Sequence, residues 1–268
     1  MTRLLLSGLV IFSLMGCATT SKAPPAAVAD LAPSGKLRAA INVGNPVLAA
    51  RGTPDPTGVS VDLARELARR LGVPVELIVF DAAGKVVEAG KAGAWDIAFV
   101  ALDPLRAQDI AQSPPYVVIE GAYMVRENSR IKSNEEVDRP GNRVVVGRGS
   151  AYDLYLTRAI KQAEIVRIQG SGLVVEHFLK QNLEVAAGVK QQLEMDAKKV
   201  SGVRILPGRF MVINQAMASQ RVTLTRGVAG ARYVREFIEE MKASGFVAQS
   251  FVRHGVQGAA VAPAGDAK

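Results

Sequence analysis

The sequence predicts an α/β protein built of two lobes. From residue 36 onwards, short apolar runs typical of strands alternate with helical patterns, and a second series of the same kind begins after Tyr123. Such alternation is typical of parallel strands covered by helices. The chain has 268 residues, of which 49% are apolar, which is enough for two modest domains with hydrophobic cores and excludes a disordered chain.

The first series is expected to form three strands and two helices. Strands are predicted over 37–43, 75–80 and 96–101, and helices over 59–71 and 84–92. The helix over 59–71 has apolar residues at helical spacing, and Gly72 is placed to end it.

The second series continues this order. Strands are predicted over 143–147, 164–168 and 183–187, and helices over 151–162, 172–180 and 191–199. An apolar run over 210–217 and a helical segment over 223–243, which Gly245 ends, follow. Two facing α/β lobes leave a cleft at the carboxyl ends of their strands, where small polar ligands bind.

The N-terminus has the features of an export signal. Arg3 precedes an apolar run over 4–15 that is too short to span about 30 Å of hydrocarbon as a helix. Leu14-Met15-Gly16-Cys17 then resembles the bacterial lipobox, in which the cysteine is lipidated and becomes the first residue of the mature chain. The alternative is a chance buried cysteine, which we would expect inside a folded element.

Charge and motifs exclude several classes of function. The net charge is +8, but Lys and Arg are spread through helical patterns without an aromatic stacking platform, so nucleic acid is not an expected partner. HExxH, GxSxG and P-loop motifs are missing from the sequence, and neither His177 nor His254 has a spaced metal-binding partner. We therefore expect no enzyme, no cofactor and no metal site.

Two segments at strand ends are candidates for binding an anion. Arg106 follows the predicted strand over 96–101 and a Pro-containing turn, where its guanidinium can take a carboxylate or pair locally with Asp103 or Asp109. In the second lobe, Gly149 and Ser150 lie between a strand and a helix, so Ser150 is expected to cap the helix and leave backbone N–H groups and a hydroxyl free for a ligand.

The order of segments over about 35–251 resembles the amino-acid-type (type 3) solute-binding proteins of bacterial ABC importers. The residues that carry the resemblance are a glycine-led helix start, a Trp-Asp-Ile strand followed by an arginine, a Ser-Pro-Pro-Tyr run and a Gly-Ser turn. In this sequence they are Gly58-Val59-Ser60-Val61-Asp62-Leu63, Trp95-Asp96-Ile97 with Arg106, Ser113-Pro114-Pro115-Tyr116 and Val146-Gly147-Arg148-Gly149-Ser150. The resemblance implies a two-lobed periplasmic-binding-protein (Venus-flytrap, type II) fold with two crossing hinge strands near 122–125 and 214–218.

The resemblance also implies a ligand site between the lobes. Arg106 matches the arginine that holds the ligand's carboxylate, and Ser150, next to Gly149, matches the hydroxyl and backbone donor of the opposite lobe. Ala101 stands where the family usually has Ser or Thr, and Val189 stands where it usually has an aspartate for the ligand's ammonium. Asn45 and the segment over 82–84 lie where an aromatic residue is common.

These departures leave the ligand open. A small carboxylate, a dicarboxylate or an amino acid held differently fits the residues better than an amino acid held in the family's usual way, because burying an ammonium without an anionic partner is costly. Asn45, Gln215 and Lys190 are possible new polar contacts, although a structural or surface role is the commoner one for each. The alternatives are a cyclohexadienyl dehydratase-like enzyme, for which Glu176 and Glu184 are the nearby acids, and an orphan or sensory binding lipoprotein.

The expected organisation follows from the signal and the resemblance together. A lipoprotein signal peptide over 1–16 precedes a flexible tether over 17–33. The first lobe comprises 34–122 and 219–256, the second lobe comprises 123–218, and a disordered tail covers 257–268. The expected product is a monomer in the periplasm, held to a membrane through Cys17, with an ABC permease as partner.

Overall fold

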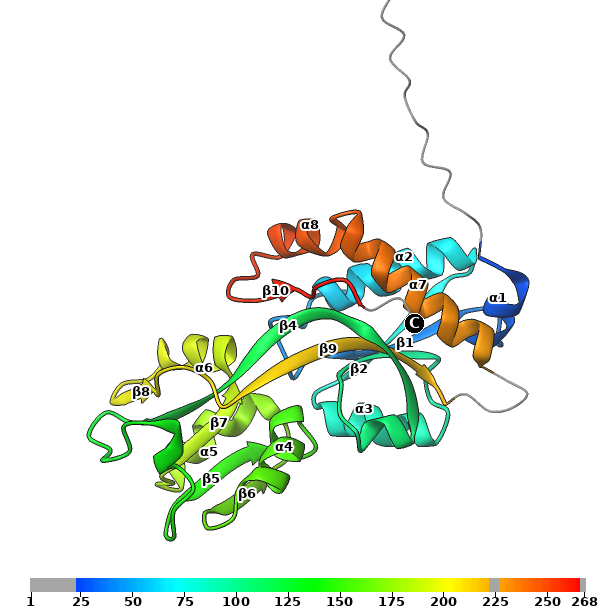
Figure 1. The fold of residues 1–268 in the computed structure, drawn as a ribbon. Coiled ribbons are helices and arrows are strands. Elements are labelled where there is room, and N and C mark those ends of the chain that lie inside the picture. Colours follow the sequence, from blue (N-terminus) through cyan, green and yellow to red (C-terminus); the bar gives the residue numbers. More distant parts are fainter. Residues whose placement is uncertain (1–22, 222–226, 266–268) are drawn as a thin grey trace, which may run out of the picture.

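Two long antiparallel strands run from one lobe of the protein into the other (Figure 1). They are β4 (Ile110–Arg126) and β9 (Met211–Gln220), paired from Ile110 opposite Gln220 to Gly121 opposite Met211. The computed structural model describes residues 23–221 and 227–265. The expected α/β fold with two lobes joined by two crossing strands is confirmed.

The first lobe adds three strands to this pair. The sheet order is β2-β1-β3-β9-β4, with β1 parallel to both neighbours and β3 antiparallel to β9. The strands are β1 (Leu37–Asn42), β2 (Val75–Phe80) and β3 (Ile97–Ala101), and the helices are α2 (Val59–Leu71), α3 (Ala83–Lys91), α7 (Val228–Ala243) and α8 (Phe246–Arg253). Because side chains alternate along a strand, Ile41 packs in the core under α2 and α7, while Ala40 packs with Val86 of α3 on the opposite face.

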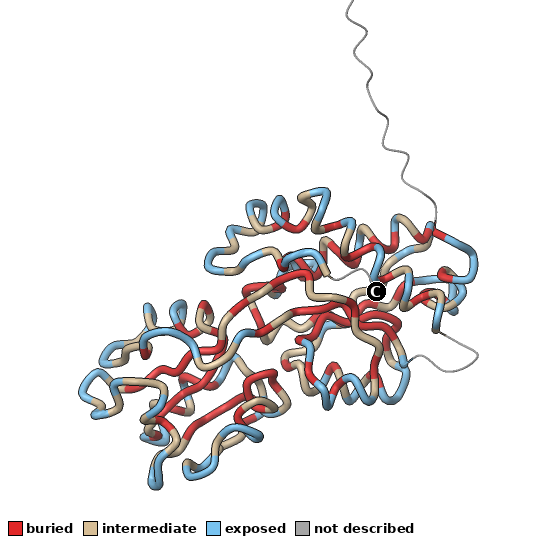
Figure 2. The backbone as a smooth tube through the Cα atoms, viewed as in Figure 1, coloured by how far each residue is buried: buried red, intermediate tan, exposed pale blue. Residues whose placement is uncertain are grey.

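The second lobe continues the same sheet in the order β4-β7-β5-β6, with β8 paired to β4. Its strands are β5 (Arg143–Gly147), β6 (Glu164–Ile168), β7 (Val185–Val189) and β8 (Val203–Ile205), and its helices are α4 (Ala151–Ala159), α5 (Val174–Lys180) and α6 (Lys190–Ala197). Short 3₁₀ turns occur at η1 (Arg106–Gln108), η2 (Asn134–Glu136) and η3 (Ser171–Leu173). Figure 2 shows that the central strands of both lobes are largely buried and that exposed residues concentrate on helices and loops. The edge strands β2 and β6 are only partly buried.

Four segments differ from the sequence expectations. Residues 25–31 were assigned to a flexible tether but form α1 (Pro25–Leu31), which packs on α7 and buries Leu31. The physical reason is that alanine is the strongest helix former and proline suits the first helical position. Helix α8 is not among the predicted elements, because the sequence indicates Gly245 (φ 77°) only as the end of a helix, whereas it also precedes the first residue of the next one.

The C-terminal tail also departs from its expected disorder. Its residues Ala260–Val261 form β10, which pairs with Val117 and Val118 of β4. The second lobe is predicted to extend to residue 218. Residues 215–219 of β9, however, pair with β3 of the first lobe. The signal peptide over 1–16 and Cys17 lie outside the described residues. Among the residues described, no helix has the length and apolar character to cross a membrane.

Asp62 ties α2 to the C-terminal helix. Its Oδ2 accepts hydrogen bonds from the Ser250 hydroxyl (2.6 Å), Arg253 Nη2 (2.7 Å) and His254 Nε2 (3.0 Å). Burial by itself raises the pKa of Asp62, but these hydrogen bonds outweigh it and leave the pKa below its ordinary value. The carboxylate form is therefore the one that stabilises the fold.

We predict that Asp62→Asn lowers the free energy of unfolding by about 1–3 kcal/mol at pH 7, because donors from α8 lose a charged acceptor. A carboxylate with a lowered pKa stabilises the native state above its unfolded pKa of about 4, and this contribution disappears as the pH falls below that value. Urea unfolding of both chains at pH 7 and pH 3 measures the difference, which should shrink at pH 3.

The matched control is Asp55→Asn, whose ion pair with Arg65 (3.1 Å) is exposed on both sides. Surface pairs contribute about 0–1 kcal/mol, so this variant should unfold nearly as the parent does. An Asp62→Asn penalty of the same size at both pH values would contradict the assignment.

Candidate ligand-binding site

A cavity of about 40 Å³ lies between the two lobes, and we call it the interlobe cavity. Both lobes contribute residues to its wall, and most of these residues lie at the ends of strands, at the starts of helices or in helix α6. The lining residues are Asn42, Gly44, Asn45, Ala83, Val100, Ala101, Arg106, Ser150, Ala151, Tyr152, Ser171, Val174, Val175, Gly188, Val189, Gln192, Leu193, Asp196, Ile213 and Gln215. The expected position of the site, at the carboxyl ends of strands between lobes, agrees with this wall.

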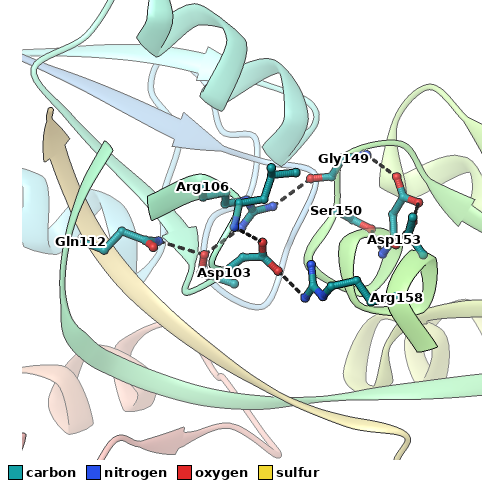
Figure 3. A network of polar contacts seen from close by, with 10 residues as sticks. Asp103, Arg106, Gln112, Gly149, Ser150, Asp153 and Arg158 are labelled. Atoms are coloured by element: carbon teal, nitrogen blue, oxygen red, sulfur yellow. Dashed lines mark hydrogen bonds and ion pairs between the residues drawn. The ribbon is translucent and has the colours of Figure 1, made fainter. Parts of the chain in front are cut away.

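Arg106 lies where β3 ends, after a turn that leads into η1, and its side chain reaches the opposite lobe (Figure 3). Nη1 donates to the Ala101 carbonyl (3.0 Å), and Nη2 donates to the Gly149 carbonyl across the lobe boundary (2.8 Å). Gln112 Nε2 donates to the same Ala101 carbonyl (3.0 Å). The residue is only 2% exposed, and its Nε–H is buried without a hydrogen-bond partner in the described part of the chain.

The charge of Arg106 is poorly compensated. Burial lowers the pKa of Arg106 to about 10, and the nearby Asp103 partly opposes this, so the guanidinium stays protonated at neutral pH. The Asp103 carboxylate instead accepts from Arg158 Nη2 (2.8 Å) and from the Leu105 N–H (2.9 Å). The sequence leaves open that Arg106 pairs locally with Asp103 or Asp109. Among the described residues, Asp103 pairs with Arg158 and Asp109 with Lys91, and neither forms an ion pair with Arg106. A buried cation bonded only to carbonyls favours an anion beside it.

Ser150 begins α4 as the sequence predicts. Its hydroxyl oxygen accepts a hydrogen bond from the Asp153 N–H (3.0 Å), and the Asp153 carboxylate accepts from the Gly149 N–H (2.8 Å). The Gly149 N–H is therefore engaged within the protein, which corrects the expectation that it is left free for a ligand. Ser150, Ala151 and Tyr152 still line the interlobe cavity, so the amino end of α4 faces it.

Most of the other predicted residues are also at this wall, but Gly149 and Lys190 are not in it. Ala101, Val189 and Asn45 line the interlobe cavity, and Asn45 Oδ1 is buried without a partner among the described residues. Gln215 of β9 lines it too. Lys190 does not line it; its Nζ pairs with Glu120 (3.2 Å).

Gln192 and Asp196 of α6 line the cavity but were not predicted from the sequence. Asp196 accepts from Gln192 Nε2 (2.7 Å) and from Lys199 Nζ (3.0 Å), while Gln192 Oε1 is buried without a partner in the described residues. Their spacing of four places both residues on one face of the predicted helix over 191–199, but only packing decides that this face meets the cavity. Tyr152 and Ser171 were missed as well; burial raises the pKa of the Tyr152 hydroxyl, which keeps it neutral.

The acids considered for an enzymatic role lie elsewhere. Glu184 accepts from Arg143 Nε (2.8 Å), and this hydrogen bond lowers the pKa of Glu184. Neither Glu184 nor Glu176 lines the interlobe cavity, where Asp196 is the one carboxylate among the described residues. No group of three metal-ligating side chains occurs within residues 23–221 and 227–265.

Comparisons with known proteins identify the fold and the family. A search of curated proteins finds no match. Among solved structures, a mutant of ArgBP from T. maritima is 18% identical over 86% of this chain and 100% of its own, with a TM-score of 0.72. The solute receptor for L-cysteine of Neisseria gonorrhoeae is 20% identical over 85% of this chain and 92% of its own, with a TM-score of 0.72.

A third solved structure is an ancestral amino acid-binding protein that is described as a precursor of cyclohexadienyl dehydratase. It is 19% identical over 84% of this chain and 98% of its own, with a TM-score of 0.70. At these identities the three structures establish the fold. The model of bacterial extracellular solute-binding proteins, family 3, matches residues 37–256, which is most of the sequence. The chain therefore belongs to the bacterial extracellular solute-binding proteins of family 3.

Proposed function

We propose that this protein is the ligand-capturing lipoprotein of an ABC importer and that it binds an amino acid or a related small carboxylate between its lobes. The observation that carries the proposal is the buried guanidinium of Arg106, which has no carboxylate partner among the described residues and lines the interlobe cavity. The neighbouring structures support an amino-acid ligand, since their descriptions name ArgBP, an L-cysteine receptor and an amino acid-binding protein.

The proposed mechanism is capture without covalent chemistry. With the lobes apart, a ligand carboxylate docks on Arg106 of the first lobe and takes hydrogen bonds from its N–H groups. Closure brings the Ser150 hydroxyl and the amino end of α4 against the ligand and expels water, which strengthens the charged contacts in the lower dielectric. β4 and β9 link the lobes and are the segments that bend.

The alternatives to an importer protein are an enzyme of the cyclohexadienyl dehydratase type and an orphan or sensory binding protein. The ancestral neighbour described as a precursor of cyclohexadienyl dehydratase favours an enzyme on the same fold. That reaction needs a general acid in the cleft, and Asp196, the one carboxylate in the described wall, is already bonded to Gln192 and Lys199. An orphan or sensory binding protein has the same ligand site and differs only in having no permease partner.

Replacing Arg106 tests the ligand site. Arg106→Ala should weaken carboxylate binding at least about tenfold, because a charged hydrogen bond contributes about 1.5–3 kcal/mol. Arg106→Lys keeps the charge but loses the planar fork, so it should recover only part of the affinity. Isothermal titration with the ligand that most raises the melting temperature measures each effect.

The control for this series is Arg232→Ala on the outer helix α7, whose partner is the exposed Glu236. It should bind as the parent does, and urea unfolding of each variant separates loss of the site from loss of the fold. Full affinity in a folded Arg106→Ala chain would remove Arg106 from the site.

A second prediction concerns the membrane anchor. Cys17 is the one cysteine of the sequence, so Cys17→Ser should abolish incorporation of an alkyne-labelled fatty acid during expression in bacteria. The parent chain should carry the label and sediment with membranes, because more than one acyl chain gives stable anchoring. An unlabelled parent chain, or equal labelling of both chains, would refute lipidation at this residue.

A further inference from the structure

Backbone atoms of the two lobes come into close contact beside Arg106. Gly84, near the start of α3, lies directly against Gly149 of the turn before α4. A Cβ built on Gly84 would lie 3.0 Å from the Arg148 carbonyl oxygen and 3.2 Å from the Gly149 Cα, and a Cβ on Gly149 would lie 2.8 Å from the Gly84 Cα. A side chain on either residue would therefore hold the lobes further apart.

Polar contacts fix the lobes at the same separation. Arg106 Nη2 donates to the Gly149 carbonyl at 2.8 Å, and Arg158 Nη2 of α4 donates to Asp103 Oδ2 of the first lobe at 2.8 Å (Figure 3). The Asp103 carboxylate is only 4% exposed. At another place on the lobe boundary, Gln191 Nε2 of α6 donates to the Gly258 carbonyl. Each of these bonds is broken if the lobes stand further apart.

This separation leaves little room inside. The interlobe cavity measures about 40 Å³, whereas ligand pockets usually offer about 300–1,000 Å³. About 10–15 Å³ of such space holds one water molecule, so the cavity accommodates only a few non-hydrogen atoms beside Arg106. Apolar side chains form much of the remaining wall. Among them are Val100, Leu193 and Ile213, each of which is only 1% exposed to solvent.

We propose that the contact between Gly84 and Gly149 sets the closing distance of the lobes and thereby restricts the ligand to compact carboxylates of about the size of glycine or alanine. A bulkier acid docks on Arg106 but keeps the lobes apart. The hydrogen bonds from Arg106 to Gly149 and from Arg158 to Asp103 then do not form. The inference rests on the proposed function, since it concerns the size of the ligand that Arg106 holds.

The test uses two series of acids that differ in size and share a head group. The first is glycine, L-alanine, L-valine and L-phenylalanine, and the second is the matching 2-hydroxy acids glycolate, lactate, 2-hydroxyisovalerate and 3-phenyllactate. Titration of the parent chain should give the tightest binding for the first two members of whichever series binds. The phenyl members should bind at least about tenfold more weakly, the effect of losing one charged hydrogen bond.

Gly84→Ala then tests the contact itself. Gly84 lies in a helix without a positive φ, where alanine is favoured over glycine, so the variant should be at least as stable as the parent in urea. It should nevertheless bind the compact acids at least about tenfold more weakly and discriminate less between compact and bulky acids. Gly172→Ala is the matched control, because a Cβ there meets nothing within 4 Å, and it should bind as the parent does.

The outcomes separate this inference from the proposed function. Binding of the phenyl members as tightly as the compact ones overturns the size restriction and leaves the carboxylate site intact. Parent-like affinity in Gly84→Ala overturns the role of the contact. Binding of none of these acids by a parent chain that binds a dicarboxylate or a larger amino acid overturns the size restriction and leaves the proposed function standing. Binding of no carboxylate of any kind overturns the proposed function, and the inference falls with it.

Discussion

The structure depends on a buried arginine that joins the two lobes without a carboxylate to neutralise it. Removing a guanidinium from water is costly, and here the visible compensation is two carbonyl oxygens, one from each lobe. Burial moves the pKa of Arg106 downwards to about 10, which is still far enough above neutrality to keep the charge. An anion that enters the interlobe cavity would supply the missing counter-charge, and this links the fold to the proposed capture of a carboxylate.

The fold brings this charge into place through strand ends. β3 ends at Ala101 and turns into η1, which presents Arg106, while β5 ends at Gly147 and turns into α4, which presents Ser150. β4 and β9 cross between the lobes, so the two turns face each other although they belong to different lobes. Gly149 in the turn before α4 lies against Gly84 near the start of α3, and so the geometry that places the charge also limits the space around it.

Most of the architecture and part of the site could be predicted from the sequence. The apolar patterns predict β1, α2 and β5, and residues at strand ends are expected at a cleft, which is why Arg106 and Ser150 could be proposed for the cavity that they line. Pro25–Leu31 and Ala260–Val261 were misjudged, because Ala- and Pro-rich composition does not reveal docking onto α7 or β4. Gln192 and Asp196 were missed, since the face of α6 that meets the cavity depends on tertiary packing.

The most direct test of the account is a thermal-shift panel on the chain from Ala18 onwards, which keeps α1, with amino acids, 2-hydroxy acids, dicarboxylates and aromatic acids. A ligand that binds only the native state stabilises it by RT ln(1 + L/Kd), where L is the free ligand concentration, so the melting temperature rises with the logarithm of the ligand concentration once this exceeds Kd. The account predicts a concentration-dependent rise with at least one compact acid that carries a carboxylate. A panel in which no acid shifts the melting temperature, at concentrations up to the millimolar range, would contradict capture of a carboxylate at Arg106.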